Sequence, residues 1–202
     1  MTTDPPPPLG QPIVALHLVA AQLRPDAPTD AVALAVERAR ALASVPGVRS
    51  VLVGRSEAQL VVATWLDDRA ALDAFAASQP HMRFVMQGLA PVIQGMWSAA
   101  VETGTPPPEA TPHALWAFAV PATDSVYEWQ VREVLQQIDA SPGVAATGST
   151  FEERERFRAA GIVLLDDAAT LAAFASRLAQ ARDAWAETLG PLQEALVPAL
   201  PA

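Results

Sequence analysis

One motif occurs twice in this chain, and the repetition limits the folds that the sequence can adopt. The segment Leu66-Asp67-Asp68, with Leu72 and Ala74-Phe75-Ala76, returns as Leu165-Asp166-Asp167, with Leu171 and Ala173-Phe174-Ala175. Every residue of the second copy lies 99 positions after its counterpart. Self-similarity at a fixed offset indicates a repeated structural unit, so we expect two halves with one fold.

The first half predicts a strand, a helix, a hairpin, a second helix and a last strand. Apolar or alternating runs predict the strands at 13–20, 48–54, 60–66 and 95–101. We expect the first helix to begin with Thr29 or Asp30 as its cap and to end near Ser44. Asp67 or Asp68 caps the second, and Pro80 kinks or restarts it. The order βαββαβ is the ferredoxin-like arrangement.

The prolines divide the chain into segments. Residues 1–12 hold five of the 19 prolines and are expected to form a disordered tail. The first ferredoxin-like module covers 13–102, a proline-rich linker covers 103–112, and the second module covers 113–202. Relative to the first half, three residues are inserted between the second and third strands of the second half.

Each module needs a partner, because its two helices cover only one face of its sheet. On the strand at 60–66, Val61, Ala63 and Trp65 share one face and apolar residues also dominate the other, so both faces are expected to be buried. We therefore predict that the two sheets pack together as a barrel with helices outside, a single-chain pseudo-dimer of the α+β class. The barrel interior is the ligand cavity that this arrangement predicts.

Composition excludes several classes of function. A net charge of −9 disfavours nucleic acid and anionic membranes as partners, and no apolar run reaches the ~20 residues of a membrane span. The chain lacks Lys, Asn and Cys, which removes Schiff-base, asparagine-amide and thiolate chemistry. The first residues lack the features of a secretory signal, so we expect a cytoplasmic protein. No cofactor or metal site is predicted, since the Asp pairs are explained as helix caps.

Several short motifs resemble the dimeric α+β barrel superfamily, particularly the antibiotic-biosynthesis-monooxygenase and stress-responsive barrel families. They are Pro46-Gly47-Val48, Trp65 at a strand end, Asp67 to Leu72 at a helix start, Ser78-Gln79-Pro80-His81 before Phe84, and Leu89-Ala90-Pro91. Family members typically form homodimers, so the resemblance implies a monomeric tandem fusion here, with a further homodimer left open. Some members oxidise aromatic polyketide phenols without metal or flavin, some cyclise polyketides, and others degrade haem.

The resemblance also assigns candidate site residues. It places Trp65 and His81 at family site positions and Phe75 where relatives carry Tyr, His or Trp. The asparagine of oxygenase members is missing, and in the second half Leu164 replaces Trp65 while Gln180 or Ala181 replaces His81.

Two histidines are the candidate catalytic residues. His81 has the reference pKa of about 6.5 that suits a general base toward a phenol or enol; a helix-terminal surface histidine is the alternative. His17 is the only polar residue in the first strand. At an offset of 101, the corresponding strand face in the second half carries Trp116 and Phe118. The alternative interpretation of His17 is again a core histidine. The predicted substrate-binding residues are Trp65, Phe75, Phe84, Trp116 and Arg83, of which Arg83 is either a contact for an anionic group or a solvated surface residue.

Three functions follow from these residues. The first is a cofactor-independent monooxygenase or cyclase that acts on an aromatic, phenolic, polyketide-like substrate in the apolar barrel cavity. The second is a non-enzymatic barrel that binds a hydrophobic ligand or serves a stress function, which the missing asparagine favours. The third is a haem-binding barrel with His17 or His81 as the ligand.

Overall fold

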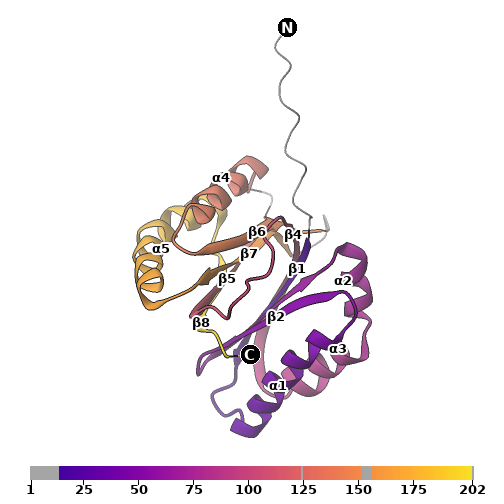
Figure 1. Cartoon of the computed structure of the whole chain (residues 1–202). Coiled ribbons are helices and arrows are strands. Elements are labelled where there is room, and N and C mark those ends of the chain that lie inside the picture. Colours follow the sequence, from indigo (N-terminus) through magenta and orange to yellow (C-terminus); the bar gives the residue numbers. More distant parts are fainter. Residues whose placement is uncertain (1–13, 124, 152–155, 202) are drawn as a thin grey trace.

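Two antiparallel sheets lie against each other in the computed structural model, and helices cover their outer faces (Figure 1). The structure describes residues 14–123, 125–151 and 156–201, so the predicted tail at 1–12 lies outside the described residues. The first half consists of β1 (Val14–Leu23), α1 (Thr29–Ala41), the 3-10 turn η1 (Leu42–Ser44), β2 (Val48–Arg55), β3 (Gln59–Leu66), α2 (Arg69–Ala76), α3 (Gln79–Arg83), the π-helical turn η2 (Phe84–Leu89) and β4 (Ile93–Thr103).

The second half repeats this order. It consists of β5 (Ala114–Pro121), α4 (Glu128–Asp139), β6 (Val144–Ser149), β7 (Phe157–Leu165), α5 (Ala168–Leu189) and β8 (Gln193–Pro198). The strand orders, β2-β3-β1-β4 and β6-β7-β5-β8, are the same in the two halves. The duplicated ferredoxin-like fold and the pseudo-dimeric α+β class are therefore confirmed.

The repeated Asp pairs act at helix starts, as predicted. The Ala71 amide donates to Asp68 Oδ1 at 2.8 Å, and the Thr170 amide donates to Asp167 Oδ1 at 2.7 Å, so each carboxylate caps a helix. The predicted cap of the first helix is wrong, because Thr29 is already helical and Pro28, the residue before it, has no side-chain donor or acceptor.

The helical segments after β3 and β7 differ. In the first half, Pro80 lies in the first turn of α3 and the Ser78 hydroxyl accepts from the His81 amide at 3.3 Å, so the helix restarts there, as predicted. The second half has no proline at this point, and α5 continues for 22 residues. Only the first half therefore has a helical layer in three short pieces.

The register of the strands identifies equivalent residues. His17 lies opposite Thr64 on β3, and Trp116 lies opposite Val163 on β7, which is the counterpart of Thr64 at the offset of 99. The offset between β1 and β5 is therefore 99 and not 101, and Trp116 is the direct counterpart of His17. The insertion of three residues is a net difference between the halves. The β6–β7 connection is longer than the β2–β3 connection, whereas β2 contains a bulge between Val48 and Ser50 that offsets part of the difference.

Side chains fill most of the space between the sheets, so the predicted cavity inside the barrel is confined to one end. The inner faces of both sheets supply one continuous apolar core whose larger members are Leu16, Leu18, Trp65, Trp97, Leu115, Phe157, Ile162 and Leu164. Interiors pack at close to crystalline density, so such a core leaves little room for a ligand. Two further apolar cores lie between each sheet and its own helices.

The two sheets meet at both edges through close backbone contacts. Gly54 on β2 bridges to Ala199 after β8, and Val101 on β4 bridges to Thr150 after β6. Gly54 and Gly148 are equivalent, because they lie opposite Val61 and Ala160. A Cβ at Gly148 would come within 1.9 Å of the Glu102 carbonyl oxygen, so glycine permits the two strands to approach.

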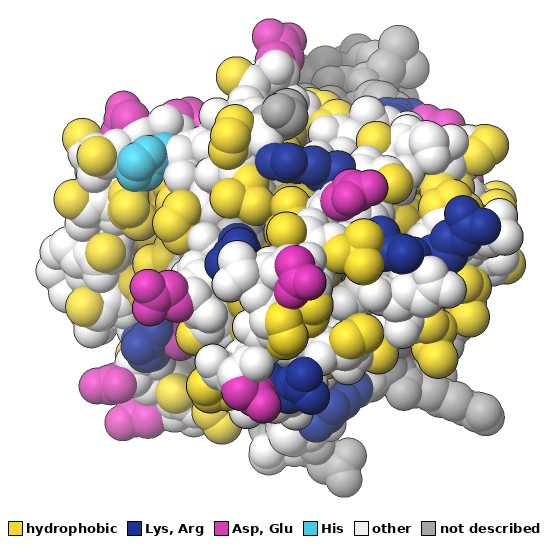
Figure 2. Space-filling view, turned by 90° about the horizontal axis from the view of Figure 1, so that it is seen from below, with side chains coloured by type: hydrophobic (Ala, Val, Ile, Leu, Met, Phe, Trp, Pro, Cys, Tyr) yellow, Lys and Arg dark blue, Asp and Glu magenta, His cyan; other side chains and the backbone are white. Residues whose placement is uncertain are grey.

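The surface carries mixed charges. Figure 2 shows one face on which acidic, basic and hydrophobic side chains are interspersed. Within the described part of the chain, no helix combines the length and the apolar character needed to span a membrane.

Candidate active site

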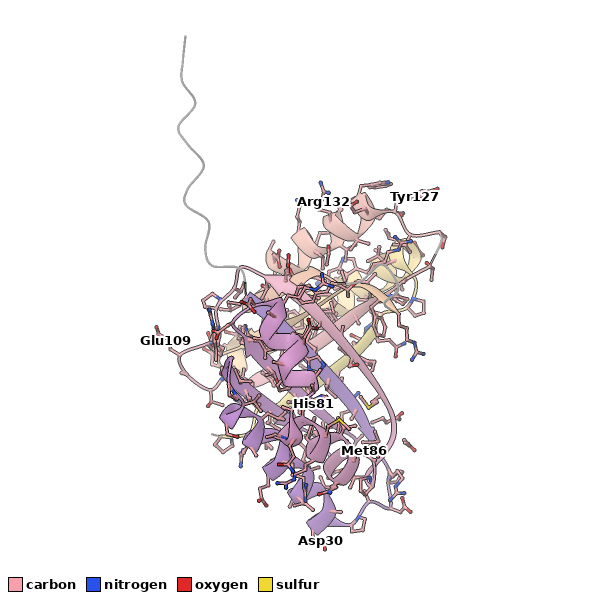
Figure 3. The ribbon with its side chains drawn as sticks, turned by 90° about the vertical axis from the view of Figure 1, so that its right-hand side faces the viewer. Asp30, His81, Met86, Glu109, Tyr127 and Arg132 are labelled. Atoms are coloured by element: carbon pink, nitrogen blue, oxygen red, sulfur yellow. The ribbon has the colours of Figure 1, made fainter. Side chains whose placement is uncertain are left out.

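Three aromatic rings from the first half meet between its sheet and its helices. The His17 ring on β1 lies 5.6 Å from the Phe75 ring on α2 and 6.0 Å from the His81 ring on α3, centroid to centroid. The rings of Phe75 and His81 lie 4.8 Å apart. Figure 3 looks onto this helical layer, with His81 in its middle. We call His17, Thr64, Phe75 and His81 the imidazole cluster.

His81 is held in one tautomer. Its Nδ1 lies 3.0 Å from the carbonyl oxygen of Ala76. A carbonyl only accepts hydrogen bonds, so Nδ1 carries the hydrogen and Nε2 of the neutral ring keeps a lone pair. Burial lowers the pKa of His81, against the opposing effect of the Ala76 carbonyl. At neutral pH the ring is therefore an uncharged base with Nε2 available.

His17 is a second half-buried imidazole with the same charge state. Burial, with a smaller contribution from the charge of His81, lowers the pKa of His17 to about 4. No hydrogen-bond partner for its ring is found among residues 14–123, 125–151 and 156–201. Two neutral imidazoles therefore lie 6.0 Å apart, centroid to centroid, and both are half-buried.

Thr64 adds a hydroxyl that the sequence analysis missed. It lies directly opposite His17 on the neighbouring strand, so the two side chains share one face of the sheet. Its Oγ1 is buried and has no hydrogen-bond partner among the described residues. A buried hydroxyl without a hydrogen bond lowers stability by roughly 1–3 kcal/mol. A threonine at this position is therefore explained if another group pairs with its hydroxyl. The sequence signal was one polar residue within the apolar strand at 60–66.

The described residues of the second half contain no such cluster. Trp116, Val163 and Phe174 take the places of His17, Thr64 and Phe75, and all three are fully buried. The Trp116 ring lies 5.2 Å from Phe174 and stacks on Phe118 at 4.7 Å, while Trp185 fills the adjacent space at 6.4 Å. Aromatic packing therefore replaces the imidazoles in this half.

The other predicted site residues lie apart from one another. Phe75 and Phe84 belong to the core beneath the helices of the first half, as does the face that carries His17. Trp65 lies on the opposite sheet face, in the core between the sheets, where its Nε1 donates to the Thr105 carbonyl at 3.2 Å. The structure thus brings His17, Phe75 and His81 together and does not bring Trp65 to them.

Arg83 and Trp116 also lie outside the imidazole cluster. Arg83 is exposed and lines a surface groove between α1 and α3 with Leu34 and Gln87. Trp116 belongs to the core beneath α4 and α5, where its Nε1 donates to Glu194 Oε2 at 3.0 Å. The described residues contain no group of three or more acidic or histidine side chains positioned to hold a metal ion.

The helical layer over the imidazole cluster is weakly anchored. Phe75 is the only buried residue of α2, and α3 has none. By contrast, α5 buries Phe174, Leu178, Trp185 and Leu189. Segments with few buried contacts open at low free-energy cost, so α2 and α3 are the part of the first half most able to move away from His17. A π-helical turn, η2, follows directly, and such turns are frequent at functional sites.

Taken together, fold and site define a pseudo-dimeric α+β barrel in which one half carries a polar cluster. No protein-family model matches the chain, and no curated protein sequence matches it. Among solved structures, it is similar to an anthrone oxidase-like protein, with a TM-score of 0.62, 11% identity, and coverage of 95% of this chain and 92% of that one.

Two further structures share the arrangement over nearly their whole length. One is a "putative monooxygenase" from Fusobacterium nucleatum subsp. nucleatum, with a TM-score of 0.58 and 12% identity. The other, with the same description, is from Lactobacillus acidophilus, with a TM-score of 0.51 and 10% identity. Each match covers 93% of both chains, so these relatives also carry the two-module arrangement in one chain. At such identities the likeness establishes the fold.

Proposed function

We propose that the protein is a cofactor-independent oxygenase that acts on a phenolic, anthrone-like substrate at the imidazole cluster of its first half. The observation that carries the proposal is the fixed tautomer of His81, whose ring lies 6.0 Å from that of His17, centroid to centroid. Thr64, opposite His17, adds a buried hydroxyl with no partner among the described residues. The likeness to an anthrone oxidase-like protein supports the choice of substrate class.

The chemistry divides between the protein and the substrate. His81 Nε2 accepts the proton whose loss converts the anthrone to its electron-rich anion. That anion reacts with molecular oxygen: one oxygen atom becomes the new ring carbonyl, and the other leaves as water with the two hydrogens of the former methylene carbon. The Thr64 hydroxyl donates a hydrogen bond to the anionic substrate oxygen, and Phe75 contacts its rings.

Substrate access in this proposal depends on the helical layer. The cluster lies outside the cavity between the sheets and outside the groove between α1 and α3. Because α3 buries no side chain, α2 and α3 move outward to admit a planar molecule and close over it. Closure then excludes water from the reacting anion.

The test is turnover of anthrone, followed as oxygen consumption and anthraquinone absorbance after subtraction of spontaneous oxidation. His81→Ala is expected to lower turnover at least about tenfold, because proton transfer to a positioned base contributes that much or more. His113→Ala is the matched control, since His113 is exposed and lies outside the cluster. Unchanged turnover in His81→Ala would contradict the proposal. A wild-type rate equal to the rate of spontaneous anthrone oxidation would contradict it as well.

A further inference from the structure

A cavity lies between the two sheets, at the end of the barrel where β1 finishes. Its volume is about 390 Å³, and both halves of the chain line it. The first half contributes Gln22, Gln59 and Trp97, and the second contributes Arg156, Gln193 and Ala195. We call it the intersheet pocket. It lies on the other side of the first sheet from the imidazole cluster, because Ala20 and Trp97 face the intersheet core whereas the residues beside His17 face the helices.

The lining of the intersheet pocket changes from apolar to polar along each strand. Inward-facing positions recur every second residue, so Leu18 and Ala20 on β1 are followed by Gln22. On β8, Val197 and Ala195 lead in the same way to Gln193. Gln22 lies directly opposite Gln59 on the neighbouring strand. Three glutamine amides therefore surround one opening above an apolar floor.

Small residues create the space. Gly95 lies opposite Gln22 on β4, and a Cβ built there would meet only Gln22 Oε1, at 3.9 Å. Ala20 and Ala195 complete the floor, and the Trp97 ring, 8% exposed, is held edge-on against Phe157 at 6.0 Å. One aromatic surface is thus fixed beside an open volume.

The pocket is asymmetric between the two halves. Ala100 on β4 lies opposite His17, and Leu196 on β8 lies opposite Trp116, so these two positions are equivalent. Three residues before each of them lie Trp97 and Gln193, which are therefore counterparts. One wall is therefore an indole and the facing wall an amide. Such a pair suits a flat ring with a polar edge better than it suits an aliphatic chain.

The pocket contains a guanidinium that could pair with an anion. Arg156 lines it, in a chain of net charge −9. The lining carboxylate, Glu194, is already engaged, because Arg182 contacts its Oε1 at 2.6 Å and Trp116 Nε1 donates to its Oε2. Among the described lining residues, Arg156 therefore supplies the positive charge, and a planar guanidinium matches a carboxylate in a bidentate geometry.

We propose that the intersheet pocket binds a small aromatic carboxylate. Arg156 pairs with the carboxylate, the glutamine amides bind hydroxyl or carbonyl groups on the ring, and Trp97 contacts the ring itself. The volume accommodates a molecule of one or two rings. This site is separate from the proposed active site and does not depend on its chemistry.

Isothermal titration calorimetry with benzoate, salicylate and 1-naphthoate tests the proposal, with salicylamide as the uncharged counterpart of salicylate. We expect at least one carboxylate to bind, and Arg156→Gln to weaken that binding at least about tenfold, the loss typical of one charge-assisted contact. Salicylamide should bind more weakly than salicylate by a similar factor. Arg132→Gln is the matched control, since Arg132 lies on α4 and pairs with Glu128.

Two variants keep the result interpretable. We expect ligand binding to quench the fluorescence of Trp97. Trp97→Phe, which keeps an aromatic ring in the core, should remove that quenching. His81→Ala should leave the affinity unchanged, because His81 lies across the sheet. The proposal is overturned if none of the three carboxylates binds at concentrations up to about 10 mM, which corresponds to a free energy weaker than about −3 kcal/mol. It is equally overturned if Arg156→Gln binds as the wild type does, or if only His81→Ala loses binding.

Discussion

Trp116 occupies the position in the second half that His17 occupies in the first. Each lies on the central strand opposite an equivalent residue, Val163 or Thr64, and each ring packs beside an equivalent phenylalanine, at 5.2 Å or 5.6 Å. The strand pairing is the same, whereas one ring is an indole that does not titrate and the other a titratable imidazole. The pair therefore offers a matched comparison within one molecule.

The first prediction concerns acid stability. The folded-state pKa of His17 is about 4, below the unfolded value of about 6.5, so the unfolded state binds more protons between these values. The stability that neutral His17 provides is thus complete above about pH 6.5 and is lost as pH falls toward 4. Between about pH 7 and pH 4.5, the wild type should lose roughly 2 to 3 kcal/mol more than His17→Phe, measured by urea unfolding.

His113→Phe serves as the control for that experiment, and it should keep the wild-type dependence on pH. Equal losses in the wild type and in His17→Phe would show that the proton affinity of His17 does not change on folding.

The second prediction concerns the unpaired hydroxyl of Thr64. Thr64→Val introduces the residue found at the equivalent position 163 and removes a buried group that has no partner among the described residues. We expect the free energy of unfolding to rise by about 1 kcal/mol, because the desolvation cost disappears. Turnover of anthrone should fall at least about threefold, the exchange of stability for activity that functional sites show.

Thr103→Val provides the contrast. Thr103 is buried too, but its Oγ1 accepts from the Thr105 amide at 3.2 Å, so its loss should lower stability by about 1 kcal/mol. If Thr64→Val destabilises the protein as Thr103→Val does, the Thr64 hydroxyl has a structural partner.

The third prediction concerns the edge between β4 and β6. Gly148→Ala places a methyl group within 1.9 Å of the Glu102 carbonyl oxygen, where backbone must move. We expect a loss of roughly 2 to 3 kcal/mol in thermal or urea unfolding, as for an overpacked core. Gly95→Ala, another strand glycine with its nearest atom at 3.9 Å, should change stability by less than about 1 kcal/mol. A similar loss in both variants would contradict the close approach of the strands.

The fourth prediction concerns the helical layer over the imidazole cluster. Amides of α2 and α3 should exchange with deuterium at least about tenfold faster than amides in the middle of α5, because α2 buries only Phe75 and α3 has no buried side chain, while α5 has four buried residues. Mass spectrometry of peptides from residues 69–83 and 170–186 provides the measurement. Equal protection of the two segments would argue against outward movement of α2 and α3.

Hydrophobic periodicity was enough to predict the architecture. The repeat at 99 positions, the alternating strands and the two Asp caps are local signals, and they predict the observed order of strands and helices and the packing of the two sheets. Pro80 similarly revealed the break between α2 and α3. The cap of α1 was missed because Pro28 supplies a compatible backbone angle without a side-chain acceptor.

The location of the cluster was not predictable from β1 alone. Both faces of this strand are apolar, with Leu16 and Leu18 on one and Ala15 and Val19 on the other, so the pattern does not say which face meets the second sheet. The pattern alone therefore does not place His17, which lies on the face that meets the helices. Trp65 was grouped with His81 by resemblance, whereas the alternation along β3 places Trp65 on the opposite face from Thr64.

Joining the two modules in one chain changes what a single mutation can do. In an assembly of identical subunits, every substitution appears on both sides of the barrel, and a polar residue kept for one site is imposed on its twin. Here residues 104–113 connect β4 to β5, so the two positions are inherited separately. Position 17 is a histidine, while position 116 is a tryptophan, which packs more favourably. Each half can therefore carry a residue that its counterpart does not.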